Sequence, residues 1–520
     1  MAHHAPTGPF TLPAINNVIP EKAKPWIYIL FVIIFQFSGG IYLAIINEMA
    51  GAEDLMMAGY ASLAGMTLVY TIMLRLKMRF TSRFSLIVTS IGLILANIIT
   101  LNTTSMPVLV FTCFTAGMLR MWATFECNSS IQLWLTPKRD LSVFFCYIYI
   151  LVQGSILLSG AGNLWIAFYS TYEYMHWLII GSLLFVILFA MVFFNSNRQQ
   201  RPFPLFGIDW LGGFLWGLSL LAIIYIAVYG SHYDWWYGEE IIDMMVFFFI
   251  ILGLNLYRAS FIRHPFIPLG VFKYRYISLS IFLYLIIDVF LAPSHLIESI
   301  YFGMLNYDMK HLVSLNLAGF VGVVIAAVFT YYYFAKAKRS YKSTFYIGFT
   351  AILGYLVLMY FSIGYGTAIE SLYLPILVRN FGYVVVAIVL LTGLTRIPFH
   401  HFFQALSVQS FIGVATGSII GSAFVEHLFK HIFQKNYSQI SASFDAVNHK
   451  TGPMELGQIM GMVEQQAMMV SFKELYGWLI IAAVIFYILS VFYKYPYYPQ
   501  NVKYPKLKTI KRYLRKVTAG

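Results

Sequence analysis

Long apolar stretches of about 20 residues, separated by short polar segments, dominate this chain. The clearest region lies between Arg83 and Arg120, where no charged residue occurs. A helix of about 20 apolar residues crosses the hydrocarbon core of a membrane. Only 11% of the residues are charged, against about a quarter in soluble domains. The pattern excludes a soluble enzyme and a secreted disulfide scaffold, and predicts an all-α polytopic membrane protein.

Fourteen such stretches predict fourteen transmembrane helices. A polar break at Asn102-Thr103-Thr104 divides the long region between Arg83 and Arg120. Two basic, proline-containing joints, 195–204 and 258–275, separate the first six spans from the next two and from the last six. The expected spans are 26–47, 55–74, 84–101, 107–134, 141–163, 174–194, 209–229, 241–257, 277–300, 309–334, 344–363, 371–395, 401–428 and 474–493.

This layout predicts two six-helix bundles with an inserted two-helix hairpin. The expected domains are a cytoplasmic N-terminal segment (1–25), an N-terminal bundle (26–195), the inserted pair (205–258), a C-terminal bundle (277–493) and a basic tail (494–520). Within the C-terminal bundle, 429–473 is the longest stretch outside the membrane. Two-bundle transporters bind substrate near the midplane, between the halves.

The distribution of basic residues predicts the orientation. Most of the 34 lysines and arginines fall in the N-terminal segment, in alternate loops and in the tail, which by the positive-inside rule places both termini in the cytoplasm. We therefore expect a multi-pass protein of the cell (inner) membrane. The tail from Lys503 to Lys516 is interpreted as an orientation signal that contacts anionic lipid of the bilayer. We expect no nucleic acid partner.

The outer segment 429–473 carries a separate expectation. Its part from Met454 to Met469 is rich in methionine and prone to form a helix. We expect an amphipathic helix that lies over the periplasmic mouth. Such a surface could dock a periplasmic adaptor that leads to an outer-membrane channel, and a solvated cap without any partner is the alternative.

Several motifs then point to a family. The sequence reads FGIDWLGG at 206–213, RHPFIPLGVFKYR at 263–275, LPILVRNFG at 374–382 and TPKRD at 136–140. Together they closely resemble the fourteen-span drug:proton antiporter branch of the major facilitator superfamily, the multidrug-resistance exporter type. The resemblance implies alternating access with small-molecule substrates and protons as partners. It also implies a cytoplasmic gate at Arg79 and Arg83, although the loop has Met78 and Thr81 where the family has Asp and Gly.

Charged residues inside the spans are the candidate site. A charge at the bilayer centre costs at least about 2.5–3.5 kcal/mol on insertion scales, so it usually faces a cavity or a partner. By the resemblance, the four deepest charges lie on helices that line the central cavity. The predicted substrate cavity is Gln36, Arg120, Gln153, Asp288 and Arg379, and Glu126 lies on the same helix as Arg120.

Asp288 is the predicted proton-coupling acid. It lies at mid-depth in its span, and Arg120 from the other bundle is its expected partner. Glu126 is the second candidate, and His295 extends the same helical face toward Glu298, with a kink expected at Pro293. Two alternatives stay open: the membrane charges form ion pairs that only hold the packing, or His295 and Glu298 are already solvated at the headgroups.

These residues favour a proton-coupled exporter of apolar or amphipathic drugs. A dedicated carrier of one metabolite, siderophore or lipid is the alternative, and a membrane-embedded enzyme is a remote third. The sequence has no Walker A motif, metal-ligand cluster or nucleophile motif, so we expect no enzyme activity, no bound metal and no cofactor. The proton gradient would supply the energy.

Overall fold

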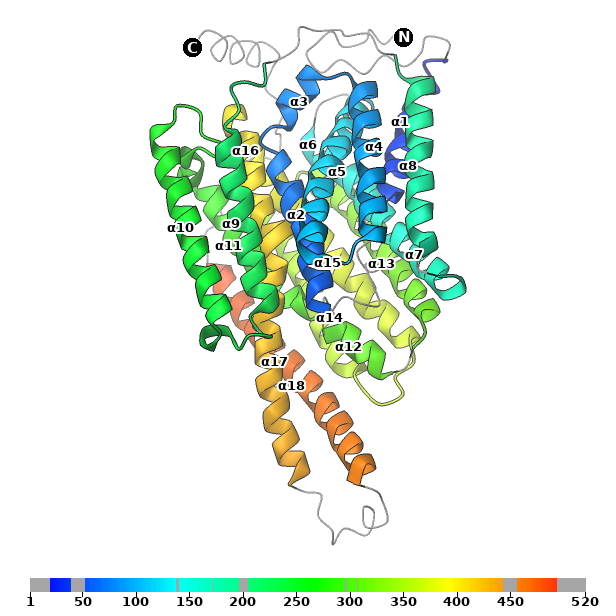
Figure 1. Cartoon of the computed structure of the whole chain (residues 1–520). Helices are drawn as coiled ribbons and strands as arrows, with labels where there is room; N and C mark the ends of the chain where they lie inside the picture. Colours follow the sequence, from blue (N-terminus) through cyan, green and yellow to red (C-terminus); the bar gives the residue numbers. More distant parts are fainter. Residues whose placement is uncertain are drawn as a thin grey trace.

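The computed structural model shows a long bundle of membrane-length helices (Figure 1). It describes residues 19–38, 52–136, 140–171, 173–195, 204–294, 297–305, 307–442 and 456–492. Twelve helices in these ranges are long and apolar enough to cross a membrane, and the bent pair α2 and α3 makes up to thirteen. The first predicted span, 26–47, is described only as far as Ser38. The chain is thus an all-α, multi-pass membrane protein, and the count of fourteen stays a prediction.

The first eight helices form the N-terminal part. The polar break Asn102-Thr103-Thr104 does divide two helices, because α4 ends at Asn102 and Pro107 stands in the first turn of α5. The second span of the N-terminal part bends by 66° between α2 and α3. The bounds are α1 Lys24–Phe37, α2 Ala52–Val69, α3 Met73–Arg79, α4 Ser82–Asn102, α5 Met106–Leu135, α6 Leu141–Tyr149, the π-helical η2 Ile150–Gly154, α7 Ser155–Tyr169 and α8 Glu173–Phe193.

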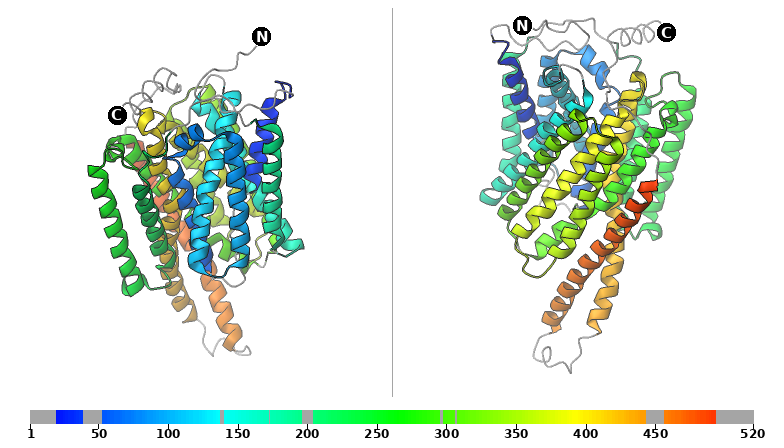
Figure 2. Two further views of the ribbon diagram at one scale, coloured as in Figure 1. Left: turned by 45° about the horizontal axis from the view of Figure 1, so that its top comes forward. Right: turned by 180° about the vertical axis from the view of Figure 1, so that it is seen from behind.

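The inserted pair consists of α9 (Trp210–Tyr229) and α10 (Glu239–Phe261), joined through the short η3 (Trp235–Tyr237). α9 packs against α2 and α17, whereas α10 leans mainly on α9 and is the least buried of the candidate spans. Figure 2 shows the pair at one edge of the molecule. The inserted helices therefore add a flank to the bundles rather than a third core.

Asp209 fixes the entry to this pair. Its carboxylate accepts hydrogen bonds from the backbone amides of Gly212 (3.0 Å) and Phe266 (3.2 Å) and from the Arg258 guanidinium (2.6 Å). Burial alone would raise the pKa of Asp209, but these hydrogen bonds and the Arg258 charge outweigh it, so the pKa lies below its usual value. One side chain thereby joins the start of α9, the end of α10 and the loop that follows.

The remaining helices form the C-terminal part. The α-helix of its first span gives way to the 3-10 turn η5 at Pro293, the position where a kink was expected. The bounds are η4 Leu269–Lys273, α11 Arg275–Leu291, η5 Ala292–Ser294, α12 Ile297–Met304, α13 Met309–Thr330, the π-helical η6 Tyr331–Lys336, α14 Tyr341–Ser362, α15 Glu370–Leu394, α16 Phe399–Ser410, the π-helical η7 Phe411–Thr416, α17 Gly417–Ser441 and α18 Leu456–Phe492.

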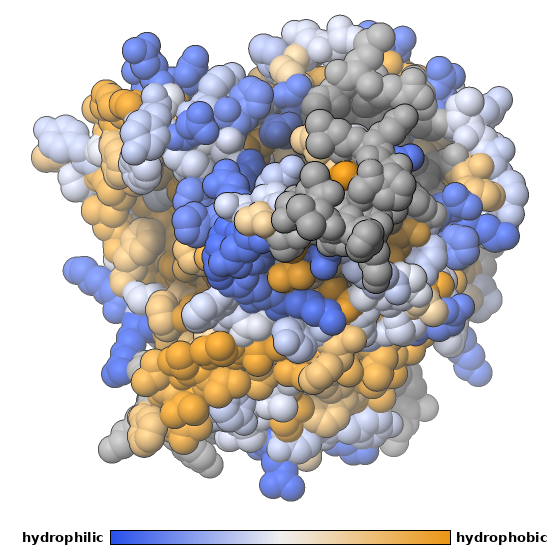
Figure 3. Space-filling view, turned by 90° about the horizontal axis from the view of Figure 1, so that it is seen from below, coloured by the Kyte–Doolittle hydropathy of each residue, from blue (hydrophilic) through white to orange (hydrophobic). Residues whose placement is uncertain are grey.

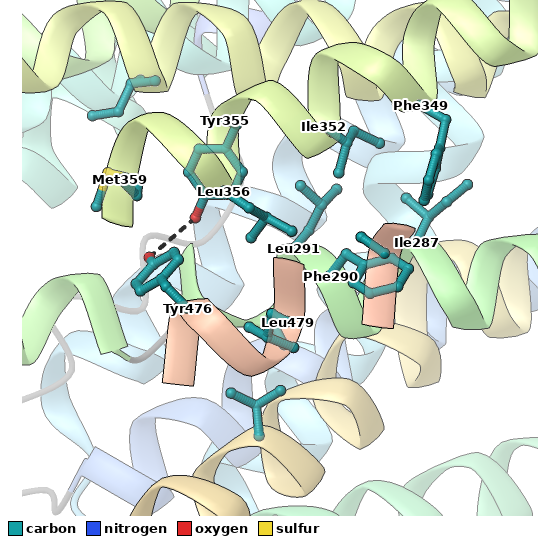
Figure 4. Packing of buried hydrophobic residues seen from close by; sticks show 14 of the residues in the cluster. Ile287, Phe290, Leu291, Phe349, Ile352, Tyr355, Leu356, Met359, Tyr476 and Leu479 are labelled. Carbon is teal, nitrogen blue, oxygen red and sulfur yellow. Dashed lines mark hydrogen bonds between the residues drawn. The ribbon is translucent and has the colours of Figure 1, made fainter. Parts of the chain in front are cut away.

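Aromatic and aliphatic side chains fill the core of the C-terminal part. Helices α11, α14 and α18 meet there, with Phe290, Phe349 and Leu479 among the buried residues. Figure 4 shows this packing and the Tyr355–Tyr476 hydrogen bond that joins α14 to α18 at 3.3 Å. The dense packing makes these helices one unit.

Two contact zones hold the N- and C-terminal parts together. In one, α2 packs on α16 and η7, and the Ser407 hydroxyl donates to the Thr67 carbonyl oxygen at 2.8 Å. In the other, α6 and α7 pack on α13 and α15 around buried Cys146 and Val323. Both zones therefore lie at the interface between the two halves.

The outer segment differs from its prediction. The stretch from Met454 to Met469 does not lie over the mouth: its described part, from Leu456, is the first part of α18, a continuous helix of 37 residues. With α17 it forms a hairpin that projects beyond the other helices (Figure 1). Figure 3 views this end and shows hydrophilic side chains near the middle of the face and a broad hydrophobic band along one flank.

Contacts between the two helices explain the projection. The Asn436 amide donates to Ser471 (3.1 Å) and Glu474 (3.0 Å), and Lys435 also pairs with Glu474 (2.9 Å). The two helices bury their apolar faces against each other, and Ile432 and Phe472 lie in the core. These contacts hold the first part of α18 against α17.

Candidate functional site

Asp288 lies where α11 meets α17. Only 5% of the residue is exposed, and it faces a Gly-Ser-Ile-Ile-Gly segment, 417–421. A methyl group added at Gly417 would stand 2.2 Å from Asp288 Oδ2, and one added at Gly421 would stand 2.9 Å from the Asp288 carbonyl oxygen. The two glycines thus let α17 approach the carboxylate closely, as small residues do between membrane helices.

Tyrosines from both halves surround this carboxylate. Tyr60 on α2, Tyr284 on α11 and Tyr383 on α15 lie near enough to interact electrostatically with Asp288. Tyr70 and Tyr149, also from the N-terminal part, are neighbours of Tyr284. The Ser418 hydroxyl beside Gly417 donates to the Tyr60 hydroxyl at 3.4 Å, which links α17 to α2. The site is therefore an acid inside a tyrosine-lined interface between the halves.

Several polar atoms at this site are unsatisfied. Asp288 Oδ2 is buried without a hydrogen-bond partner among the described residues, and so are both amide atoms of Gln409 on α16. Gln409 lies close to Tyr284 and is 2% exposed. Buried polar groups almost always have partners, so these atoms are exceptions within the described part of the chain.

The expected Arg120–Asp288 pair is not formed. Within the described ranges, Asp288 makes no ion pair, because its carboxylate is turned toward the glycines of α17. Arg120 lies half-buried on α5 in the N-terminal part. The prediction of this pair is therefore wrong for the conformation seen here.

Glu126, the second acid, has a basic partner. It is 1% exposed on α5 and forms an ion pair with Lys77 on α3. Lys77 also reaches the hydroxyls of Ser82 and Ser130, at 3.4 Å each. The loop motif predicted a gate at Arg79 and Arg83, which lie at the end of α3 and in the first turn of α4. The structure shows an ion pair in this region between Lys77 and Glu126, and the sequence analysis did not predict a role for Lys77.

Arg379 belongs to a separate network in the C-terminal part. Its Nη1 donates to Glu298 Oε2 at 2.7 Å, and the Tyr355 hydroxyl donates to Glu298 Oε1 at 2.7 Å. The guanidinium also stands over the Tyr355 ring, 5.8 Å from its centroid. Glu298 is 4% exposed, so the solvated alternative is wrong for this residue. His295 lies outside the described residues.

The predicted cavity residues thus fall into different environments. The Gln36 amide is buried and donates to the Thr124 hydroxyl at 3.0 Å, which ties α1 to α5. Gln153 is in the π-helical η2, which contacts α1 and α13. No group of three or more possible metal ligands occurs in the part of the chain that the structure describes. The structure brings Asp288 together with tyrosines rather than with the other predicted charges.

The comparisons with known proteins identify the fold. No protein-family model matches the chain, and no curated protein matches it. Solved structures do match. A POT peptide transporter in complex with sulfate has a TM-score of 0.55 at 13% identity, over 90% of this chain and 94% of that one.

Two further structures agree. The nucleoside transporter NupG has a TM-score of 0.51 at 11% identity, over 88% of this chain and 98% of that one. The human organic anion transporter TETRAN has a TM-score of 0.50 at 11% identity, over 89% of this chain and all of that one, 100%. The chain therefore has the major facilitator fold. The named structures are all of transporters.

Proposed function

We propose that the protein is a proton-coupled secondary transporter that exports apolar or amphipathic small molecules across the cell (inner) membrane by alternating access. The observation that carries the proposal is the buried Asp288 carboxylate, which has no ion-pair partner among the described residues and lies between the halves of the fold. Its neighbours come from α2, α15 and α17, which belong to both halves. Motion of the halves would change its surroundings.

The proton step follows from the energetics of burial. An isolated charge is costly in the membrane interior, so the neutral, protonated carboxyl would be favoured while the site excludes water. When the halves separate, water or a cationic substrate would reach the carboxylate and favour release of the proton. A site that alternates between such environments couples proton movement to the exchange of conformations.

The wall of the site supports the substrate class. Tyr60, Tyr284 and Tyr383 lie near Asp288, and tyrosine combines an apolar ring with a hydroxyl, which suits ligands that combine an apolar body with a polar or cationic group. The direction of transport rests on the resemblance to drug exporters. The orientation with cytoplasmic termini rests on the basic loops.

The test is pH-driven flux in proteoliposomes that contain the purified chain. Asp288→Asn mimics the protonated acid, so it should still bind substrate but lose accumulation driven by a pH gradient. Asp243→Asn, at an exposed acid on α10, is the matched control and should keep it. If Asp288→Asn keeps its pH dependence while Glu126→Gln loses it, coupling belongs to Glu126 and the assignment is wrong.

A substrate panel separates the remaining alternatives. Export of several unrelated amphipathic dyes would support the proposal. Transport of one metabolite, siderophore or lipid alone would favour a dedicated carrier. No flux of any compound, in either direction and with a gradient imposed, would contradict a transporter.

A further inference from the structure

A membrane-facing groove lies outside the tyrosine-lined site, between the inserted helix α9 and the N-terminal helices α2 and α5. It has a volume of about 660 Å³ and an almost wholly apolar wall, within the range of about 300–1,000 Å³ typical of ligand sites. Phe111, Trp210 and Phe214 line it and are 69%, 54% and 61% exposed. Since these residues lie in membrane spans, the groove opens sideways to lipid.

Two glycines on α9 let neighbouring side chains pack closely at the wall of the groove. Gly213 and Gly217 are four residues apart and both line its wall. A methyl group at Gly217 would stand 3.0 Å from the Phe114 ring and 3.3 Å from Leu68. Gly217 therefore lets Phe114 and Leu68, which also line the groove, pack directly against α9.

A second cavity, of about 280 Å³ and polar in character, adjoins this groove, at the end that the basic loops assign to the cytoplasm. The two share Ile72 and Phe266 in their walls, so one ligand could occupy both. The polar cavity is lined by basic and histidine side chains from three regions of the chain: Arg75, Arg263, His264, His400 and His401.

The charge balance of the polar cavity is positive. Asp209 is the one acid in its wall, and its carboxylate is already paired with Arg258, which does not line the cavity. Two more atoms in the wall, His401 Nδ1 and Gln404 Oε1, are buried without a hydrogen-bond partner among the described residues. The cavity therefore combines positive charge with polar groups that a ligand could satisfy.

We propose that the two cavities form a binding site for one anionic phospholipid of the cytoplasmic leaflet. One acyl chain lies in the apolar groove along α9, and the phosphate lies in the basic cavity near Arg75 and Arg263. Arginine is suited to phosphate because its planar fork donates two hydrogen bonds at once. Basic pockets between membrane helices on the cytoplasmic side are known places for anionic headgroups.

The position of the basic cavity determines which parts of the fold a bound lipid would contact. The basic cavity is lined by the α2–α3 bend, by the loops on either side of the inserted pair and by the start of α16. These segments belong to the N-terminal part, the inserted pair and the C-terminal part. A bound lipid would therefore join all three, in addition to the Asp209 contacts.

The test is native mass spectrometry of the full chain, purified and supplied with phosphatidylglycerol or phosphatidylcholine of identical acyl chains. The unchanged protein should retain phosphatidylglycerol in preference. Arg263→Gln and Arg75→Gln should each weaken that retention about fivefold. Lys273→Gln removes an exposed charge outside the cavity and should leave it unchanged. Equal retention by Arg263→Gln and Lys273→Gln would overturn the headgroup site.

Two further experiments test whether the apolar groove holds the acyl chain. Val110→Trp, and independently Leu221→Trp, fill the groove and should lower lipid retention, whereas Val321→Trp, at a lipid-facing position on α13 that is 45% exposed, should not. Soluble glycerophosphoglycerol carries the headgroup without chains and should compete weakly. Competition equal to that of the lipid would show a site for free phosphoesters and overturn the lipid assignment. Unchanged retention in both groove variants would also overturn it.

Discussion

Arg379→Met tests whether the Glu298 network holds the C-terminal part together. The substitution would leave Glu298 with Tyr355 as its one remaining hydrogen-bond donor in the network. Removing one partner of a buried pair costs about 3–5 kcal/mol. The Arg379 side chain is 21% exposed and the Glu298 side chain 5%, so screening by water at the arginine places the expected loss near the lower end, about 3 kcal/mol.

A double-mutant cycle with Glu298→Gln isolates the pair. The free energy of unfolding would be measured by reversible denaturation in lipid–detergent bicelles. The double variant buries no unpaired charge. Its loss of unfolding free energy should therefore be about 2 kcal/mol smaller than the sum of the losses in the two single variants. A coupling energy below about 0.5 kcal/mol would refute the reasoning. Flux by the double variant should keep its pH dependence, since the coupling acid proposed here is Asp288.

Three further predictions concern other contacts. Gly417→Val should impair flux and lower stability by about 1–3 kcal/mol, because its side chain would collide with Asp288. Thermal unfolding measures the loss, with Gly457→Val as the control because a methyl group there meets nothing. Lys77→Met should destabilise the chain more than Lys77→Met combined with Glu126→Gln, as measured in the same bicelles, since only the single variant leaves the buried Glu126 charge unpaired. The pKa of Asp209 is lower in the folded chain than its usual value, so its stabilising contribution is complete above about pH 4 and is lost as the pH falls below that. When stability is measured against pH, Asp209→Asn should lack this loss at low pH. The same loss at low pH in both proteins would disprove the prediction.

Much of the helical architecture could be predicted from the sequence. The periodic apolar stretches predicted the helices, and Asn102-Thr103-Thr104 and Pro293 predicted breaks that the structure has. Local composition is enough for such features, because the bilayer demands helices of a certain length. The continuation of α18 into a projecting hairpin was missed, since a methionine-rich stretch is equally compatible with a surface helix and with a paired one.

The candidate site was only partly predictable. The depth of Asp288 follows from its position in an apolar span, but its partners depend on how helices rotate about their axes. The spacing of Gly417 and Gly421 is a signal of close helix approach, and it could have indicated α17 rather than α5 as the neighbour. Nothing local marks Lys77, which resembles every other basic residue at a helix end until tertiary packing brings Glu126 beside it.

Because α18 is long, a small rotation within the membrane moves the tip of the outer hairpin by a larger distance. Its 37 residues extend about 55 Å, and the hydrocarbon core accounts for about 30 Å. Roughly 25 Å of helix therefore stands beyond the membrane, braced to α17 by the Asn436 hydrogen bonds. If the C-terminal part rotated by about 15° about the membrane centre, as subunits do in known switches, the tip, about 40 Å from that centre, would move roughly 10 Å. Spin labels near the described ends, Ser441 and Leu456, would thus report motion at the membrane centre from a position fully in water.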